Sequence, residues 1–361
     1  MSEAAHSLIT ASLKRILEQR ETLSRAESAA LLNQILDVDD FGSELRISAL
    51  LGALAARGET EYELAGFVDA LRARVTPLPL SLAEQALLVD TCGTGGDLSG
   101  TFNISTAAAL VACAAGASVA KHGNRAVTSR CGSADVLEAL GIPVDLSPAL
   151  AAASLRTHRF AFLPAPALQP AMKSVMPIRR ALGVRTAFNI LGPMTNPAGA
   201  RAQVLGVYSK RLVAVVANTM KHLDTRHAFI VHGETDTADN QNPDNKNGMD
   251  EFSISGPTHL AEVRNGEATF RTVLPEAFGL KLSLNLHLQG GDAETNAQIL
   301  RAIFAGELSP RRDVVLMNAA AVLVTAGLDD TFAQATQHAQ SVIASGAVTA
   351  LVAALAHPQA R

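Results

Sequence analysis

The hydrophobic pattern of the chain changes near residue 76, and this change limits the possible folds more than any other feature. Before it, apolar residues recur only at helical spacing, as at Leu31, Leu32, Ile35 and Leu36, which is typical of amphipathic helices. After it, short apolar runs that end in glycine or polar clusters alternate with helical stretches. This alternation predicts a parallel α/β domain. The fold class expected is a small all-helical domain joined to a larger α/β domain with a mostly parallel central sheet.

Four helices are predicted before the change. Two of them begin with capping boxes, Ser24 with Glu27 and Thr60 with Glu63, in which a hydroxyl and a carboxylate satisfy free amides of the first turn. The segment 75–79, Val-Thr-Pro-Leu-Pro, follows the fourth helix and breaks the pattern. It is therefore predicted to be a linker.

The expected domain boundaries follow from these patterns. Residues 1–76 and about 169–196, a proline-containing stretch without a strand pattern, are assigned to the helical domain. Residues 80–168 and 197–361 are assigned to the α/β domain. The segment 234–247 is rich in Asp, Asn and Thr and almost free of apolar side chains, so it is predicted to be a flexible surface loop.

The composition argues against several classes of protein. With 48% apolar and 18% charged residues, the chain can bury a sizeable core and is not disordered. The net charge of −4 argues against a nucleic-acid partner. Cys92, Cys113 and Cys131 fit neither a zinc site nor a disulfide framework, so reduced thiols are expected. With no signal-peptide pattern and no apolar run long enough to span a bilayer, a cytoplasmic protein without a membrane partner is expected.

The first candidate site is the glycine-rich turn Gly93-Thr94-Gly95-Gly96-Asp97. It follows the apolar run 86–89, a predicted strand, and leads into a predicted helix. Glycines let backbone amides approach an anion, and a helix N-terminus adds a favourable dipole. The hydroxyls of Ser105 and Thr106 can bind phosphate oxygens or a metal. The spacing matches neither the Walker nor the dinucleotide pattern, and a tight strand-to-helix turn remains an alternative.

The second candidate site is Lys121-His122-Gly123-Asn124-Arg125, with Ser129 and Ser133 downstream. It also follows a short predicted strand and precedes a predicted helix, where α/β proteins form ligand crevices. The lysine and the arginine suit phosphate, whereas the histidine and the asparagine suit a neutral or carboxylate acceptor. A solvated loop with incidental charges is the alternative.

Two charged pairs complete the candidates. Asp250-Glu251 could hold Mg²⁺, which prefers oxygen ligands and usually bridges phosphates. Arg179-Arg180 could clamp an acceptor carboxylate in a bidentate manner. Either pair could also be an ordinary solvated surface pair.

Taken together, these motifs resemble the anthranilate phosphoribosyltransferase family. The resemblance covers almost the whole chain in the expected order, at residues 90–97, 101–106, 121–125, 132–138, 185–193, 231–233, 249–251, 290–292 and 318–320.

The resemblance implies transfer of 5-phosphoribosyl from phosphoribosyl pyrophosphate to the amine of anthranilate. The products would be N-(5-phosphoribosyl)anthranilate and pyrophosphate, in a step of L-tryptophan biosynthesis. It also implies Mg²⁺, with two ions per subunit, and a homodimer formed through the small domain. A same-fold transferase that uses another aromatic amine, a pyrimidine nucleoside phosphorylase-like enzyme and a non-catalytic nucleic-acid-binding relative remain alternatives.

The resemblance also implies a set of site residues. No acid, base or nucleophile is assigned, since the acceptor amine is already nucleophilic. The expected metal ligands are Ser105, Asp250 and Glu251, and the expected anthranilate-binding residues are Gly93, Asn124 and Arg179. The expected donor-binding residues are Gly93, Gly96, Asp97, Thr101, Asn103, Ile104, Ser105, Thr106, Lys121, His122, Gly123, Asn124, Arg125, Ser129 and Ser133.

Three features depart from the family pattern. Leu98 stands where the family usually has glycine, and a positive φ there would be strained, so a reshaped loop tip is expected. Leu168-Gln169 replaces a Tyr-His or similar pair before Pro170, which removes an aromatic ring and an imidazole from the expected acceptor entrance. Residues 234–247 are inserted between two motifs that are normally close, as a surface excursion or as a lid near the metals.

Overall fold

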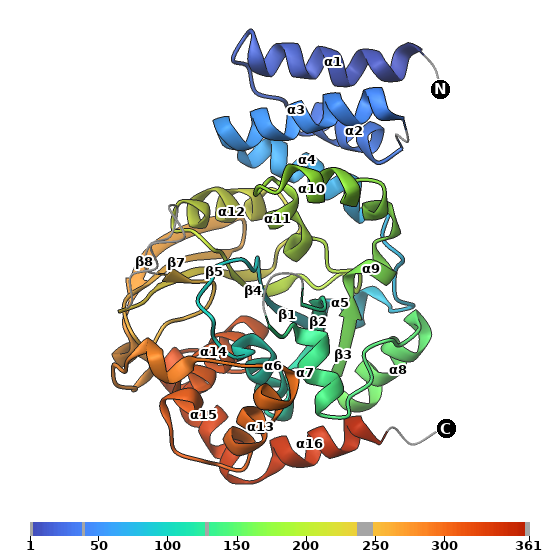
Figure 1. The fold of residues 1–361 in the computed structure, drawn as a ribbon. Helices are drawn as coiled ribbons and strands as arrows, with labels where there is room; N and C mark the ends of the chain where they lie inside the picture. Colours follow the sequence, from blue (N-terminus) through green and yellow to red (C-terminus); the bar gives the residue numbers. More distant parts are fainter. Residues whose placement is uncertain (1–2, 38–39, 127–129, 237–247, 358–361) are drawn as a thin grey trace.

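The computed structural model describes residues 3–37, 40–126, 130–236 and 248–357. The four predicted N-terminal helices are present at the top of Figure 1. Both predicted capping boxes are formed at the second and fourth of these helices. Most of the predicted 234–247 loop, from residue 237 on, lies outside the described residues. The helices are α1 (Glu3–Leu17), α2 (Arg25–Leu36), α3 (Phe41–Arg57) and α4 (Glu61–Arg72).

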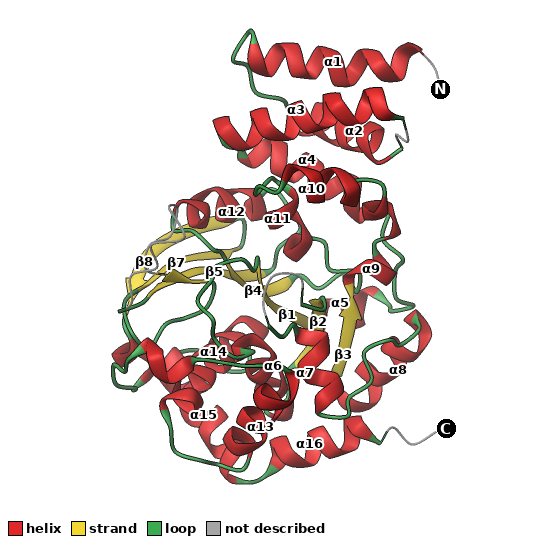
Figure 2. Cartoon of the chain, in the orientation of Figure 1, coloured by secondary structure: helices red, strands yellow, loops and turns green. Residues whose placement is uncertain are grey.

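The second part of the chain is built on one sheet, which Figure 2 shows in yellow. The strand order is β3-β2-β1-β4-β5-β7-β8, and β6 pairs with β5. The first five strands in this order are parallel, and the pairs β5–β7, β7–β8 and β5–β6 are antiparallel. The predicted fold class is therefore confirmed. The strands are β1 (Leu88–Gly93), β2 (Ser118–Gly123), β3 (Phe160–Pro164), β4 (Ala202–Gly206), β5 (His227–Glu234), β6 (Gly248–Met249), β7 (Thr258–Arg264) and β8 (Glu267–Val273).

The strand predicted from residue 86 begins two residues later in the structure, at Leu88. Ser81 and Glu84 form a capping box that begins α5 (Leu82–Leu87), so the first half of the apolar run ends a helix. β1 begins only at Leu88. The local capping signal therefore prevails over the apolar run.

Helices cover both faces of the sheet. One hydrophobic core lies between the sheet and the C-terminal helices, and a second joins the four N-terminal helices to α12 and to the segment 175–194. Helix α8 packs against β3. The remaining helices are α6 (Ile104–Ala114), α7 (Ser133–Ala139), α8 (Pro148–His158), α9 (Ala165–Leu168), α10 (Met176–Leu182), α11 (Phe188–Leu191), α12 (Arg211–Lys221), α13 (Ala293–Phe304), α14 (Pro310–Ala326), α15 (Phe332–Ala344) and α16 (Ala347–Ala356). Short 3₁₀ helices are η1 (Pro170–Lys173), η2 (Gly192–Met194), η3 (Pro275–Phe278) and η4 (Asn285–Leu288).

The central core depends on small side chains. Residues 107–109 of α6 are three fully buried alanines, and residues 319–321 of α14 are three more. Alanine keeps helix propensity high and allows two helices to approach closely. Beside them, Phe252 makes edge contacts with Phe278 and Phe332. The segment that carries Asp250 and Glu251 is therefore anchored in the core directly after these two carboxylates.

Polar contacts join the helical bundle to the α/β part. The Arg25 guanidinium donates to both carboxylate oxygens of Asp69, at 2.6 and 2.9 Å, and to the backbone carbonyl of His222 at 2.7 Å. His222 follows the last residue of α12, where a cation interacts favourably with the helix dipole. Arg72 of α4 donates to the carbonyl of Met194 at 3.0 Å. These contacts fix α2 and α4 against α12 and η2.

Among the described residues, no single helix is both long and apolar enough to cross a membrane. The bent pair α15 and α16 meets that standard only when the two helices are taken together.

We predict that Gly66→Ala destabilises the protein although alanine favours helices. A Cβ at Gly66 in α4 would lie 2.1 Å from the Arg25 carbonyl oxygen of α2, and overpacking of this kind costs about 1–3 kcal/mol. Gly52 in α3 has no atom within 4 Å of the corresponding position, so Gly52→Ala should stabilise by up to about 1 kcal/mol. Urea unfolding of both variants measures the difference. A Gly66→Ala variant as stable as Gly52→Ala would contradict this close helix contact.

Candidate active site

The candidate site lies at the carboxyl ends of three neighbouring strands. β1, β2 and β4 end at Gly93, Gly123 and Gly206, and the first and third of these glycines are paired in register. The chain adds β2 on one side of β1 and β4 on the other. Ligands of open α/β sheets bind at such a switch point, outside the carboxyl ends of the strands. Both predicted ligand loops, after β1 and after β2, begin here.

The glycine loop contacts Asp250 directly. The Gly95 amide donates to Asp250 Oδ2 at 2.7 Å, and the Asp250 amide donates to Asp97 Oδ2 at 3.2 Å. A Cβ on Gly93 would lie 2.1 Å from Asp250 Oδ2, and one on Gly206 would lie 1.6 Å from the Asp250 carbonyl oxygen. Only glycine at these two strand ends permits this approach.

Glu251 faces the start of α6. The Ser105 amide donates to Glu251 Oε1 at 3.0 Å, as expected for a carboxylate at a helix N-terminus. Lys121, buried at the end of β2, donates to Ser105 Oγ at 3.3 Å and to the Thr91 carbonyl at 2.7 Å. The structure thus brings together the predicted metal ligands and Lys121 from three distant segments.

The charges of this cluster are unbalanced. Burial raises the pKa of Glu251 to about 7, although Lys121 opposes this effect. Burial, followed by the charges of Asp97 and Glu251, raises the pKa of Asp250 well above its usual range. Burial also lowers the pKa of Lys121. The carboxylates of Asp97, Asp250 and Glu251 thus lie together near a single ammonium group, which also interacts with Asp90. A bound divalent cation would stabilise this arrangement.

The donor set fits Mg²⁺ that is completed by substrate. Among the described residues, no group of three or more His, Cys, Asp or Glu side chains is arranged to hold a metal by itself. Mg²⁺ commonly binds through one or two carboxylates, several waters and substrate phosphates. Asp250, Glu251 and the Ser105 hydroxyl can supply such a partial set of oxygen ligands.

The other residues of the first loop lie at or near the start of α6. The Thr106 hydroxyl is buried without a hydrogen-bond partner among the described residues. Asn103 precedes the helix, and Thr101 pairs with Gln289 in an isolated bridge. The Ile104 side chain lies in the hydrophobic core, so only its backbone can face a ligand.

The loop after β2 divides its predicted residues among different environments. His122 is buried: its amide donates to Asp90 Oδ1 at 3.1 Å, and Nε2 has no partner among the described residues. Burial lowers the pKa of His122 to about 4. Asn124 is exposed, and Ser133 begins α7. Ser129 lies outside the described residues.

Arg125 is bound to carboxylates. Its guanidinium donates to both oxygens of Glu138, at 2.5 and 2.6 Å, and lies 3.7 Å from Asp145. In this arrangement the side chain is directed to α7 and not to the glycine loop.

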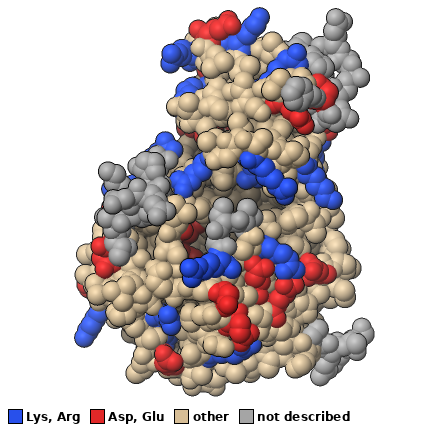
Figure 3. Space-filling view, in the orientation of Figure 1, with Lys and Arg blue, Asp and Glu red and all other residues tan. Residues whose placement is uncertain are grey.

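Arg179 lies on α10, apart from the strand ends. Its guanidinium lies 5.6 Å from the centre of the Phe188 ring and 3.7 Å from Met176 Sδ. Within the described part of the chain no carboxylate is bonded to it, no hydrogen bond joins it to Gly93 or Asn124, and burial lowers its pKa. Figure 3 shows basic side chains around the hollow between the helical bundle and the α/β part.

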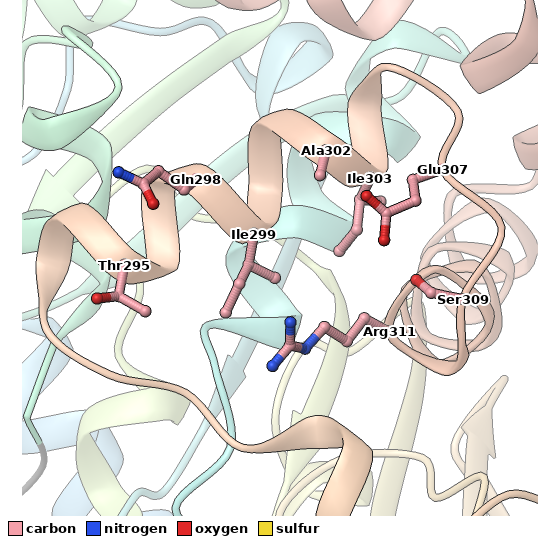
Figure 4. Close-up of a pocket in the computed structure, with 8 residues that line it drawn as sticks. All are labelled: Thr295, Gln298, Ile299, Ala302, Ile303, Glu307, Ser309 and Arg311. Carbon is pink, nitrogen blue, oxygen red and sulfur yellow. The ribbon is translucent and has the colours of Figure 1, made fainter.

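Two cavities lie outside the carboxylate cluster. One, of about 300 Å³, is next to the candidate site and is lined by Asn124, Arg125, Ala134, Val144, Asp145, Phe162, Pro164, Pro166 and Ala167. The other, of about 320 Å³, is lined by residues of α13 and by Glu307, Ser309 and Arg311 around the start of α14 (Figure 4). None of the predicted site residues that the structure describes lines this second cavity.

The two described departures from the family pattern have clear structural outcomes. Leu98 adopts φ 61° and is 51% exposed, so the strained conformation is kept and the loop tip is not rebuilt to avoid it. Leu168 is packed in a small core beside β3. The buried Gln169 donates through Nε2 to the Thr195 carbonyl at 2.7 Å and to the Thr195 hydroxyl.

Several residues that build the site are absent from the predicted set of site residues. Asn196 donates through Nδ2 to the buried carboxylate of Asp90 at 2.8 Å. Arg185 donates to the Gly96 carbonyl and stacks on the Tyr208 ring at 4.1 Å. Arg185 begins the 185–193 motif and Asn196 lies shortly after it. That motif is the sequence signal by which both residues could have been predicted. For Gly206, no local signal distinguishes this glycine from an ordinary turn residue.

Comparison with known proteins follows the two parts of the fold. The family described as "Glycosyl transferase family, helical bundle domain" matches residues 10–75, and the "Glycosyl transferase family, a/b domain" matches residues 85–349. The chain is similar to the anthranilate phosphoribosyltransferases of an Anaeromyxobacter species (46% identity, 89% of both chains) and of Solibacter usitatus (45% identity, 95% of this chain and 96% of the relative).

Solved structures agree with these matches. The anthranilate phosphoribosyltransferase of Thermus thermophilus superposes with a TM-score of 0.84 at 36% identity, over 97% of this chain and 98% of that one. The Saccharomyces cerevisiae enzyme, solved in complex with PRPP and Mg, gives a TM-score of 0.82 at 27% identity, over 98% and 97%. The chain belongs to this glycosyl transferase family and, within it, to the anthranilate phosphoribosyltransferases.

We predict that His122 makes the protein less stable as the pH falls from about 6.5 to about 4. Its pKa is about 4 in the folded protein instead of the usual 6.5, so the unfolded chain takes up the proton first. Stability is lost as the pH falls through this window, by up to about 3 kcal/mol.

Denaturant unfolding at pH 7 and at pH 4.5 measures this loss. The loss should be smaller in His122→Gln, and the exposed His287→Gln controls for removal of an imidazole. Equal pH dependence of the wild type and His122→Gln would contradict a buried neutral His122.

Proposed function

We propose that the chain transfers the 5-phosphoribosyl group from phosphoribosyl pyrophosphate to the amine of anthranilate. The products are N-(5-phosphoribosyl)anthranilate and pyrophosphate, in a step of L-tryptophan biosynthesis. The observation that carries the proposal is the meeting of the glycine loop, Lys121 and the pair Asp250-Glu251 at the carboxyl edge of the sheet. Its membership of the family supports the same reaction.

The donor pyrophosphate would lie between the glycine loop and the start of α6. Backbone amides of the loop and Lys121 are the groups proposed to contact its oxygens. The Thr106 hydroxyl, which has no hydrogen-bond partner within the described part of the chain, lies buried in the first turn of the same helix. Asp250, Glu251 and Ser105 would hold Mg²⁺, with two ions per subunit. Bound Mg²⁺ would neutralise part of the charge on the leaving pyrophosphate.

The chain itself contributes positioning and charge stabilisation. As pyrophosphate leaves C1, positive charge builds on the ribose and negative charge on the leaving group. Lys121 and the loop amides are placed to stabilise that negative charge. The acceptor amine is already nucleophilic, so no base or covalent nucleophile is assigned and alignment of the two substrates supplies the rest.

The acceptor would lie between the helical part and the strand ends. Arg179, which has no carboxylate partner in the described part of the chain, would bind the anthranilate carboxylate. Gly93 and Asn124 would contact the acceptor from the α/β side, beside the cavity of about 300 Å³. A different aromatic amine is the second candidate acceptor, because Leu168-Gln169 replaces the Tyr-His or similar pair of the family. Gln169 is bonded to the Thr195 carbonyl.

The proposed domain division places the acceptor-binding arginine on the small domain. This domain comprises residues 1–76 and 169–196, and the α/β domain comprises 80–168 and 197–361. Val175 and Ile178 share their core with the N-terminal helices, which supports the assignment of α10 to the small domain.

We also propose a cytoplasmic homodimer that contacts neither nucleic acid nor a membrane. The exposed Leu17 of α1 and Leu45 of α3, 54% and 58% accessible, are candidates for the contact through the small domain. Light scattering after gel filtration measures the mass, and a monomer at micromolar concentration would reject the homodimer.

We predict that Asp250→Asn combined with Glu251→Gln abolishes Mg²⁺-dependent turnover, because both proposed carboxylate ligands lose their charge. Loss of anthranilate fluorescence with donor and Mg²⁺ present is the assay. Glu294→Gln combined with Glu307→Gln removes the same charge from exposed positions and should leave the rate unchanged. Undiminished turnover in the first variant would reject the metal site. Donor binding by the wild type without turnover would direct the test to other aromatic amines.

We predict that Arg179→Ala raises the KM for anthranilate about 10- to 100-fold, the value of a charge-assisted hydrogen bond, and leaves the KM for the donor nearly unchanged. The exposed neighbour Arg180 provides the matched control, and Arg180→Ala should behave like the wild type. Equal effects of the two substitutions would count against the role of Arg179.

A further inference from the structure

We propose that Asn296 of α13 is a positioning residue for the phosphoribosyl donor, a role that rests on the proposed function. It acts through Asn103, which lies directly before α6. Asn296 is buried, with 2% of its surface exposed, and both polar groups of its side chain are already bonded to other parts of the chain. Its side chain forms one link in a chain of hydrogen bonds between two donor loops.

The orientations of both asparagine side chains are fixed by backbone groups at the ends of this chain. The Gly291 amide, which can only donate, is 2.8 Å from Asn296 Oδ1. Asn296 Nδ2 therefore faces Asn103 and donates to its Oδ1 at 2.8 Å. The Cys131 carbonyl, which can only accept, is 3.3 Å from Asn103 Nδ2. Neither amide group can be flipped without placing two like groups together.

This chain of bonds links the segments that carry the donor site. Asn103 is followed by Ser105 and Thr106 at the start of α6, and Cys131 is followed by Ser133 at the start of α7. These hydrogen bonds therefore set the distance between the start of α6 and Ser133, which both belong to the proposed donor site. Anions bind at the N-terminus of a helix such as α6, so this distance determines how well Ser133 can contact a donor molecule bound there.

Backbone contacts hold α13 close to the first loop. The Gly290 amide donates to the Gly100 carbonyl at 3.0 Å, and the Phe102 amide donates to the Leu288 carbonyl at 3.1 Å. A Cβ on Gly290 would lie 2.7 Å from the Phe102 Cα. The segment before α13 thus runs beside the loop, and Asn296 continues this contact through its side chain.

The decisive variant is Asn296→Asp. It keeps the size of the side chain and the acceptor for the Gly291 amide, but an ionised carboxylate cannot donate to Asn103 Oδ1. Asn296→Leu, which has a similar size and no donor at any pH, is measured beside it because burial favours a protonated carboxyl that could still donate. Removal of a buried hydrogen bond of this kind weakens an interaction about tenfold. We expect the dissociation constant of phosphoribosyl pyrophosphate with Mg²⁺ to rise about tenfold by calorimetry, and the KM for anthranilate to change less than twofold.

Two controls separate positioning from loss of stability. Leu300→Ala removes a buried side chain from the same helix and should lower the melting temperature without changing donor affinity. A double-mutant cycle then combines the Asn296 substitution with Asn103→Ala. If Asn296 acts through Asn103, the double variant binds the donor no more weakly than Asn103→Ala alone. Asn296→Ala, which buries no charge, replaces Asn296→Asp if the latter does not fold.

The outcomes distinguish this proposal from the proposed function. A wild type that does not bind phosphoribosyl pyrophosphate would reject the function and this role with it. A wild type that binds, together with an Asn296 variant of equal affinity, would overturn the positioning role alone. Additive losses in the double-mutant cycle would overturn it as well.

Discussion

The site depends on the close approach of Asp250 to the ends of β1 and β4. Gly93 and Gly206 stand side by side in the sheet, and a Cβ on either would lie within about 2 Å of Asp250 atoms. The absence of these two side chains lets the carboxylate reach the Gly95 amide. Through Asp250 the sheet, the glycine loop and the segment after β6 become one structure, and the position of Glu251 follows from it.

The cost of this arrangement is a group of half-buried like charges. Burial raises the pKa values of Asp250 and Glu251, the charge of Asp97 adds to this effect, and Lys121 offsets it only in part at Glu251.

The C-terminal helices hold the segment that carries these charges in place. Asn318 of α14 donates to the Phe252 carbonyl at 3.2 Å and accepts from its amide at 3.0 Å. The C-terminal helices α13 and α14 thus each supply a buried asparagine that holds one loop of the site.

The sequence predicts those features that short segments determine. Capping boxes gave two helix starts, and the change of periodicity gave the fold class. The predicted start of β1 is wrong because a third capping box, at Ser81 and Glu84, makes the first half of the apolar run the end of a helix. The reshaped loop tip predicted at Leu98 is not formed, since the residue keeps a positive φ. The backbone around it is bonded on both sides, at Gly95 and between Gly290 and Gly100.

Contacts between residues that are far apart in the sequence could not be predicted from local patterns. Asn296 lies 193 positions from Asn103, and Asp250 lies 155 positions from Gly95. No periodicity or local propensity relates such pairs, since only tertiary pairing brings them together. The same holds for Arg125, whose charge suited phosphate in the sequence but is bound to Glu138 in the fold. Burial, which decides the pKa of His122 and Glu251, is likewise a property of the folded chain.

The most direct test of this account is metal binding by a Gly206→Ala variant. Mn²⁺ in place of Mg²⁺ allows binding in the presence of phosphoribosyl pyrophosphate to be measured by electron paramagnetic resonance. The added methyl group would overlap the Asp250 carbonyl, so we expect the variant to lose Mn²⁺ binding while circular dichroism shows an intact fold. Gly52→Ala, remote from the site, should bind like the wild type. A folded Gly206→Ala protein with unchanged Mn²⁺ affinity would contradict the central role of this contact.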